Sequence, residues 1–252
     1  SFKYIYDNIK KDVHLTSIAG GTDMVGCLVL GNIYSAVYKG EIQGQSLAID
    51  VDVFTNEGKS TKDGEKGELV VKQPFPSMPI KFWGDENGEK YHKAYFTKFK
   101  NIWHHGDFIE RTVNNGFIMR GRSDATLNPG GVRIGTSEIY QQVEDIDFIN
   151  EGLVVGQDYK NDIRIVLFVT TKNNKELNDE KIKFIKTRIR KNCSPKHVPS
   201  LIIKAPEIPR TKSGKIVELA VKKIINGEEI NNVESIANPQ SLKFFKNLEQ
   251  LK

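Results

Sequence analysis

The chain has 252 residues, of which 38% are hydrophobic, enough to form one large domain or two small domains with a buried core. The net charge of +5 comes mainly from scattered lysines without interleaved aromatic residues, so we expect no nucleic-acid partner, whereas an anionic substrate is compatible with it. No apolar run approaches the roughly 20 residues that span a bilayer, and Cys27 and Cys193 lack CxxC spacing. We therefore expect no membrane partner, no disulfide or zinc site, and a cytoplasmic location.

The first half of the chain is predicted to be rich in β-strands. Apolar residues alternate with polar or small ones over residues 47–53, and a second apolar run at 67–71 follows a turn-rich stretch. Residues 107–113 and 117–119 are predicted to form a hairpin, because the Asn115-Gly116 pair between them tolerates the positive φ of a tight turn. Together these segments predict a small barrel or sheet.

After Gly121 the pattern changes to a mixture of helices and strands, which we expect at residues 137–143, 153–155, 163–169, 179–191, 200–203 and 218–225. In the helix at 179–191, Ile182, Ile185 and Ile189 lie on one face. These elements predict a small α+β unit, with the domain boundary at residues 122–125.

The first motif that could carry chemistry is Gly20-Gly21-Thr22-Asp23. A flexible backbone, a hydroxyl and a carboxylate suit a nucleotide phosphate and its magnesium ion. Taken alone, the same residues are more often a turn with a helix cap.

The second motif, Trp103-His104-His105-Gly106-Asp107, places a carboxylate at the entrance of a strand. The Asp107 carboxylate could accept hydrogen bonds from both hydroxyls of a ribose. A metal site at the adjacent histidines is the less favoured interpretation, because neighbouring side chains on a strand point to opposite faces and no third ligand follows.

The third motif is more specific, since residues 121–134 join Arg122 and Arg133 through the glycine pair Gly130-Gly131, where a ligand can approach the backbone closely. The alternative is a surface turn with two solvated arginines, which residues 136–140 in fixed register make less favourable.

The fourth motif is the basic, glycine-containing loop at residues 209–216. Its Lys215 could project into a cleft toward a phosphate, and a solvated turn is the alternative.

These four segments resemble, in order and approximate spacing, the late core motifs of the adenylate-forming enzymes, which include the acyl-CoA synthetases. The amino-acid sequence at residues 17–23, 74–79 and 122–140, and in the tail at 221–239, is similar to that of the acetoacetyl-CoA synthetase branch in particular. The resemblance covers nearly the whole chain. It implies an α/β and α+β fold: residues 1–121 form the β-rich end of the large AMP-binding domain with its distorted β-barrel subdomain, 122–125 a hinge, and 126–252 a small C-terminal lid domain with a tail.

By the same resemblance, eight positions acquire expected roles. Lys215 matches the mobile catalytic lysine, Asp124 the hinge and Gly131 the segment that lines the CoA channel. The expected nucleotide-binding residues are Thr22, Asp107, Arg122 and Arg133, and Asp23 stands where relatives carry a glutamate associated with magnesium.

The implied activity is that of an AMP-forming acid-thiol ligase, with acetoacetate, ATP and CoA as substrates and Mg²⁺ as cofactor. The Ser/Thr/Gly-rich loop that holds the β- and γ-phosphates in this superfamily does not occur in the sequence. We therefore expect the chain to be the C-terminal portion of the enzyme, to depend on a missing N-terminal part, and to be inactive alone. The alternatives are a fragment of an acetyl- or propionyl-CoA synthetase, or a non-catalytic nucleotide- or protein-binding module.

Overall fold

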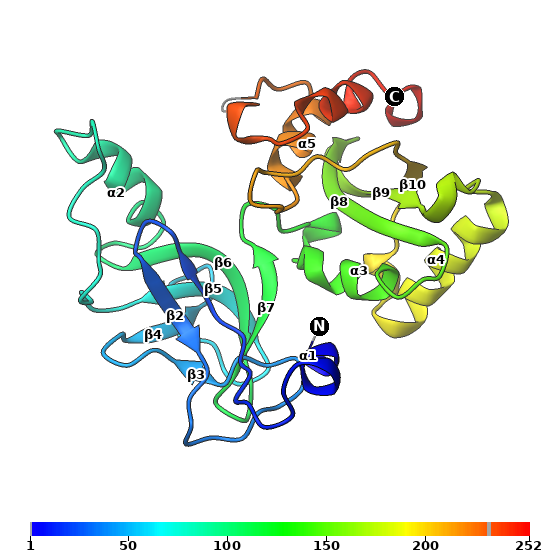
Figure 1. Ribbon diagram of the computed structural model, residues 1–252. Helices are drawn as coiled ribbons and strands as arrows, with labels where there is room; N and C mark the ends of the chain where they lie inside the picture. Colours follow the sequence, from blue (N-terminus) through cyan, green and yellow to red (C-terminus); the bar gives the residue numbers. More distant parts are fainter. Residues whose placement is uncertain (1, 231–232) are drawn as a thin grey trace. The chain divides into compact units, whose positions relative to one another are not determined.

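A computed structural model describes residues 2–230 and 233–252 of the chain. The chain divides into two compact units, with the boundary between Met119 and Arg120 (Figure 1). Among the described residues, none of the helices combines the length and the apolar character that a membrane crossing requires.

The first unit is built on two antiparallel sheets. A three-stranded sheet has the order β1-β2-β3, and a four-stranded sheet has the order β4-β5-β6-β7. The strands are β1 (Ala19–Gly21), β2 (Gly26–Leu30), β3 (Gly44–Gln45), β4 (Val51–Phe54), β5 (Lys66–Val71), β6 (Trp103–Arg111) and β7 (Phe117–Arg122), with helices α1 (Phe2–Asn8) and α2 (Glu89–Tyr95).

The predicted hairpin is confirmed, and one predicted strand is shorter than expected. Asn115 adopts φ 59° in the turn between β6 and β7, and the Thr112 amide donates to the Gly116 carbonyl at 2.9 Å. In contrast, residues 47–50 are not part of a strand. Ala48 has φ 61° and Leu47 is 96% exposed. The alternation of apolar and polar residues in the sequence therefore begins four residues before the strand itself, which starts at Val51.

The core of the first unit fixes the beginning of β6. Trp103 is 2% exposed, and its ring stacks on the ring of Tyr95 from α2 with centroids 3.6 Å apart. Leu28, Val53 and Ile109 belong to the same buried cluster. Burial of this large aromatic side chain therefore holds the residues that follow Trp103 in place.

The second unit is a three-stranded sheet covered by helices on both faces (Figure 1). Its strand order is β10-β9-β8, antiparallel between β8 and β9 and parallel between β9 and β10. The elements are α3 (Thr136–Val143), β8 (Ile149–Tyr159), β9 (Asp162–Thr171), α4 (Asp179–Asn192), β10 (Leu201–Lys204) and α5 (Glu218–Ile225). Short 3-10 turns lie at Pro129–Gly131, Lys172–Asn174, Pro195–His197, Val233–Ser235, Pro239–Phe245 and Glu249–Leu251.

Alternation along β8 divides the core of this unit into two layers. Val154 packs with the apolar residues of α3 and α4, whereas Leu153 and Val155 pack with those of α5 and the C-terminal tail. Both faces of the sheet are therefore buried, which explains the continuous apolar run at residues 165–169 of the central strand, β9. The α+β class predicted from the sequence is confirmed.

Candidate functional site

In the first unit, Thr22 and Asp23 form the turn between β1 and β2. The Val25 amide donates to the Thr22 carbonyl at 3.2 Å, and both turn side chains are exposed. A Cβ at Gly20 would lie 2.2 Å from the carbonyl oxygen of Gly26, so only glycine allows the two strands to approach this closely. The motif therefore presents a hydroxyl and a carboxylate on a tight hairpin.

Asp107 lies in β6 and belongs to a chain of polar contacts. The indole nitrogen of Trp103 is only a donor, and it contacts Nδ1 of His105 at 3.3 Å. This contact leaves the proton of a neutral imidazole on Nε2, which lies 3.7 Å from the Asp107 carboxylate. Asp107 is 8% exposed, so its carboxylate lies in a mostly buried position.

The structure brings the first two motifs together. A Cβ at Gly21 would lie 2.8 Å from a carboxylate oxygen of Asp23 and 3.0 Å from Cε1 of His105. The turn that carries Thr22 and Asp23 is thus adjacent to the strand that carries Asp107. These residues are distant in sequence, and pairing of separate strands makes them neighbours.

Tyr91 also belongs to this neighbourhood, and sequence analysis did not identify it. Its hydroxyl is buried and has no hydrogen-bond partner among the described residues. Burial raises the pKa of the Tyr91 hydroxyl, and the nearby Asp23 carboxylate raises it further. Tyr91 lies on α2 near the aromatic cluster around Trp103, a position that only the folded structure reveals.

The adjacent histidines make separate contacts. His104 Nε2 lies 2.9 Å from the fully buried Glu68 carboxylate, which also contacts Lys98 at 2.6 Å, whereas His105 contacts Trp103 and Asp107. No group of three His, Cys, Asp or Glu side chains suited to a metal ion occurs within residues 2–230 and 233–252.

In the second unit, Arg122 and Asp124 stand in a tight turn at the end of β7. The Arg122 Nε atom lies 3.5 Å from the Asp124 carboxylate, and the Ala125 amide donates to the Arg122 carbonyl at 3.2 Å. Lys222 of α5 contacts the Asp124 carbonyl at 3.4 Å. The predicted hinge therefore lies beside the helix that follows the Lys215 loop.

The glycine loop, residues 128–133, is closed by two reciprocal 2.9 Å hydrogen bonds between Leu127 and Ile134. Gly130 and Gly131 have φ values of 56° and 78°, in the region that favours glycine. The Gly130 amide donates to the Asp162 carboxylate at 2.9 Å, and this hydrogen bond lowers the pKa of the carboxyl. Among the described residues, no atom beyond the chain neighbours lies within 4 Å of a Cβ placed at Gly131, so this position of the loop is not packed. Arg133 is half-buried at the end of the loop.

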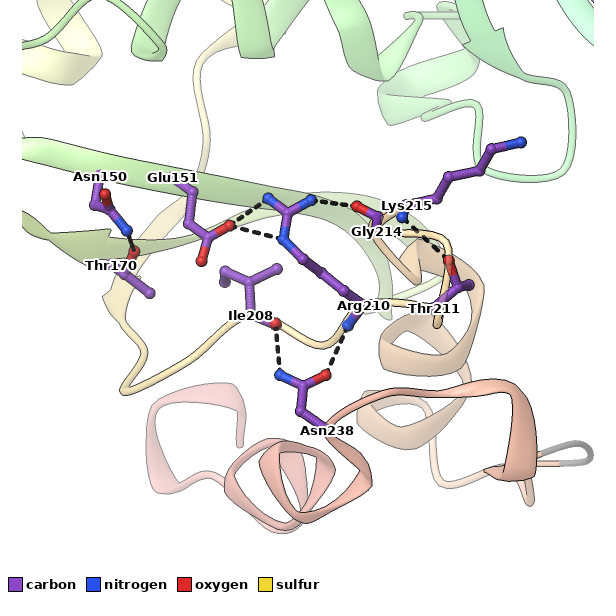
Figure 2. Close-up of polar contacts among 9 residues, drawn as sticks. All are labelled: Asn150, Glu151, Thr170, Ile208, Arg210, Thr211, Gly214, Lys215 and Asn238. Carbon is purple, nitrogen blue, oxygen red and sulfur yellow. Dashed lines mark hydrogen bonds and ion pairs between the residues drawn. The ribbon is translucent and has the colours of Figure 1, made fainter.

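The lysine loop, residues 210–216, is a second tight turn (Figure 2). The Thr211 amide donates to the Lys215 carbonyl at 2.8 Å, and the Lys215 amide donates to the Thr211 hydroxyl at 3.1 Å. The Lys215 side chain is exposed and extends away from the loop. The Arg210 guanidinium lies between the Glu151 carboxylate and the Gly214 carbonyl, a contact that the sequence did not predict.

The two loops contact opposite ends of the β8–β9 hairpin. The lysine loop is linked to Glu151 at the start of β8, and the glycine loop to Asp162 just after β8 ends at Tyr159. A strand rises about 3.3 Å per residue, so these contact points are roughly 25 Å apart. The two loops are therefore attached to well-separated parts of the hairpin.

A buried polar pair connects α3, α5 and β8. The Tyr140 hydroxyl donates to the Glu218 carboxylate at 2.5 Å and accepts from the Val154 amide at 3.1 Å. Burial raises the pKa of Glu218 above its ordinary value of 4.5, hydrogen bonds from Tyr140 and Thr136 lower it, and the Asp124 carboxylate raises it. This pair was also not identified from the sequence.

No protein-family model matches the chain. The acetoacetyl-coenzyme A synthetase of Rhizobium meliloti (strain 1021) is 55% identical over 251 residues, which covers 100% of this chain and 38% of the relative. The acetoacetyl-CoA synthetase of Xenopus tropicalis is 45% identical over 253 residues, with the same two coverages. The chain thus spans 38% of the length of these curated relatives.

Solved structures of related enzymes also resemble the chain. The acetoacetyl-CoA synthetase from Streptomyces lividans aligns with a TM-score of 0.89 and 37% identity, over 99% of this chain and 38% of that one. A benzoate CoA ligase from Burkholderia xenovorans LB400 aligns with a TM-score of 0.68 at 23% identity, over 81% of this chain and 39% of that one, which supports the fold alone. The chain is therefore similar over its whole length to acetoacetyl-CoA synthetases, and it has the fold of part of such an enzyme.

Proposed function

We propose that the chain is part of an AMP-forming acid-thiol ligase that converts acetoacetate, ATP and CoA into acetoacetyl-CoA, AMP and pyrophosphate. The observation that carries this proposal is 55% identity to an acetoacetyl-CoA synthetase over 100% of the chain. Because the chain spans 38% of that relative, we propose that the remaining length supplies the loop for the β- and γ-phosphates and most of the carboxylate pocket. The expected location is the cytoplasm, where the two cysteines would stay reduced.

The chemistry requires two steps, because a carboxylate is resonance-stabilised and its oxygen is a poor leaving group. In the first step, an acetoacetate oxygen attacks the α-phosphorus of ATP, and pyrophosphate leaves with the electrons of the broken P–O bond. In the second step, the CoA sulfur attacks the acyl carbonyl, loses its proton and displaces AMP. Each step breaks a bond to a good leaving group.

The first unit would hold the nucleotide. The mostly buried Asp107 carboxylate of β6 would accept hydrogen bonds from the two ribose hydroxyls, and Thr22 would contact the AMP phosphate. Mg²⁺ commonly uses one or two carboxylates together with substrate phosphates, so the exposed Asp23 carboxylate beside the Thr22 hydroxyl fits such an ion. When bound, the ion would neutralise phosphate charge.

The second unit would act as a lid that presents different residues in the two steps. Lys215 would stabilise the negative charge that develops on the α-phosphate and carboxylate, while Arg122 and Arg133 would contact the nucleotide. Gly131 would line the path of the CoA thiol, and Asp124 would be the pivot. The separation of roughly 25 Å between the points where the two loops contact β8–β9 supports alternation, because both loops must visit one reaction centre.

The test uses the longer protein that contains this chain. Purified protein should catalyse acetoacetate-dependent exchange between pyrophosphate and ATP, and should release AMP in proportion to thioester once CoA is added. Acetate and propionate serve as competing substrates. A preference for either would place the enzyme in another branch, and no exchange with any carboxylate would refute the ligase proposal.

A further inference from the structure

Arg210 connects the central sheet of the second unit to the residue that precedes Lys215. Its Nε atom donates to a Glu151 carboxylate oxygen at 3.1 Å, and Nη2 donates to the same oxygen. Its Nη1 atom donates to the Gly214 carbonyl at 2.6 Å. One planar group therefore joins β8 to the tip of the lysine loop (Figure 2).

The base of the loop is held independently by the C-terminal tail. The Asn238 side chain accepts from the Arg210 amide at 2.9 Å and donates to the Ile208 carbonyl at 3.0 Å (Figure 2). The Ala237 amide donates to the Arg210 carbonyl at 2.8 Å. These backbone contacts do not use the guanidinium, so its removal should leave the base of the loop in place.

The tip of the loop depends more on Arg210. Gly214 has φ 84°, and among the described residues no atom beyond its chain neighbours lies within 4 Å of a Cβ placed on it, so packing at its α-carbon does not restrict it. Its carbonyl belongs to the peptide group that leads into Lys215. The amide of that peptide donates to the Thr211 hydroxyl within the loop, and the guanidinium is the group that ties its carbonyl to the sheet through Glu151. A lysine at position 210 could not replace this function fully, because its ammonium group lacks the rigid, planar fork that holds two acceptors at fixed angles.

We propose that Arg210 is a positioning residue for Lys215: Glu151 orients the guanidinium, and the guanidinium orients the Gly214 peptide from which Lys215 projects. This inference rests on the proposed ligase function, and it assigns to the Arg210–Glu151 pair a role in the first half-reaction. The side chains of the pair are 38% and 23% exposed. Ion pairs with such exposure contribute little to folding, so replacing Arg210 should leave the unit folded.

The test measures both half-reactions separately in the longer protein. Arg210→Gln should lower the single-turnover rate of adenylation by about 10- to 100-fold, because small misplacements of a catalytic group have effects of this size. The KM for ATP and the conversion of supplied acyl-adenylate to thioester should change little. Arg210→Lys should retain an intermediate rate, and Glu151→Gln combined with Arg210→Gln should cost no more than Arg210→Gln alone.

A matched control is available on the same strand. Asn150 precedes Glu151 and contacts the Thr170 hydroxyl at 3.4 Å instead of the loop, so Asn150→Ala should leave both half-reactions unchanged (Figure 2). A second measurement needs no activity. In the 252-residue chain, Arg210→Gln should speed hydrogen exchange at the Thr211 and Gly214 amides, which are bonded within the loop, and Asn150→Ala should not.

Unchanged adenylation in Arg210→Gln would overturn the proposal. So would an equal loss of both half-reactions with a lower melting temperature, which would indicate a merely structural role. If the wild-type protein itself made no adenylate, the ligase function would be refuted. The exchange rates of the loop amides would then still decide whether Arg210 orders the loop, and unchanged rates would overturn that step as well.

Discussion

At the scale of single residues, Lys215 should matter in only one of the two proposed half-reactions. In the longer protein, Lys215→Ala should lower the adenylation rate by about 10²- to 10³-fold, comparable with the loss of an oxyanion-hole donor. Conversion of chemically supplied acyl-adenylate to thioester should stay near normal. Lys212→Ala is the control, because Lys212 is an exposed lysine of the same loop. Equal losses in both half-reactions would contradict the assigned role.

Glu218 should make the stability of the second unit depend on pH. Its pKa in the folded state is raised above the ordinary 4.5, so between pH 4.5 and the raised pKa the folded unit binds more protons than the unfolded chain. The stability that this carboxyl contributes is therefore complete below pH 4.5 and is lost as pH rises through the raised pKa. Glu218→Gln removes the ionisable group, so this pH-dependent loss of stability should disappear. The amide oxygen of glutamine can still accept the hydrogen bond from the Tyr140 hydroxyl.

The stability of Glu218→Gln relative to wild type should accordingly rise with pH between pH 4.5 and pH 8. Hydrogen exchange of the central β8 amides, corrected for the intrinsic effect of pH, reports the stability of this unit. Glu228→Gln, which changes an exposed glutamate, should show no such trend. A difference that is independent of pH would mean that the Glu218 pKa is not raised.

At the scale of elements, the glycine loop should separate stability from activity. Gly131 has φ 78°, so Gly131→Ala should destabilise the second unit by about 1 kcal/mol because alanine rarely adopts this conformation. If the loop lines the CoA path, the variant should also raise the KM for CoA or slow thioester formation, while adenylation stays normal. Gly227→Ala is the matched control, since Gly227 has the same φ at the end of α5. A loss of adenylation instead would assign the loop to the other step.

Several elements were predictable because their signals are local. The helix predicted at 179–191 is observed at Asp179–Asn192, where the Asn178 side chain accepts from the Lys181 amide, and α5 has the predicted bounds. The Asn115-Gly116 turn was predicted from backbone preference alone. The strand expected from residue 47 begins only at Val51, because alternation of side chains does not report where a chain turns.

The contacts around the site were not predictable, since they join residues far apart in sequence. Glu151 is 59 residues from Arg210, and Tyr140 is 78 residues from Glu218. Periodicity and turn propensity carry no information about such pairs. The motifs indicated the chemistry at Lys215 and Asp107, whereas the residues that orient these groups required a folded structure.

At the scale of the whole molecule, the 252-residue chain alone should not make acyl-adenylate at a significant rate. It spans 38% of the relatives' length, and its sequence contains no Ser/Thr/Gly-rich phosphate loop followed by lysine. Acetoacetate-dependent pyrophosphate release by the purified chain should stay at background, with the longer protein as the positive control. Robust release by the chain alone would require a phosphate site that its motifs do not indicate.

Asp124 should be the pivot of the proposed lid. It lies in the turn between β7 and the glycine loop, and hinges absorb large changes in φ and ψ at a few residues between elements. Within the described part of the chain, no acceptor is found for the Asp124 amide, so proline at this position fixes φ without breaking a hydrogen bond. Asp124→Pro should therefore restrict reorientation more than it destabilises either unit.

In the longer protein, Asp124→Pro should retain adenylation if the fixed orientation is the adenylating one, and should slow thioester formation so that acyl-adenylate accumulates. Asp124→Ala is the control, because it removes the 3.5 Å contact with Arg122 but leaves φ unrestricted. Single-turnover rates of each half-reaction, measured for wild type and both variants, separate the two effects. An equal loss of rate in both variants would assign the role to the Asp124 carboxylate. Unchanged rates in Asp124→Pro would place the pivot elsewhere, because a fixed φ at the true pivot must hinder one of two steps that need different lid orientations.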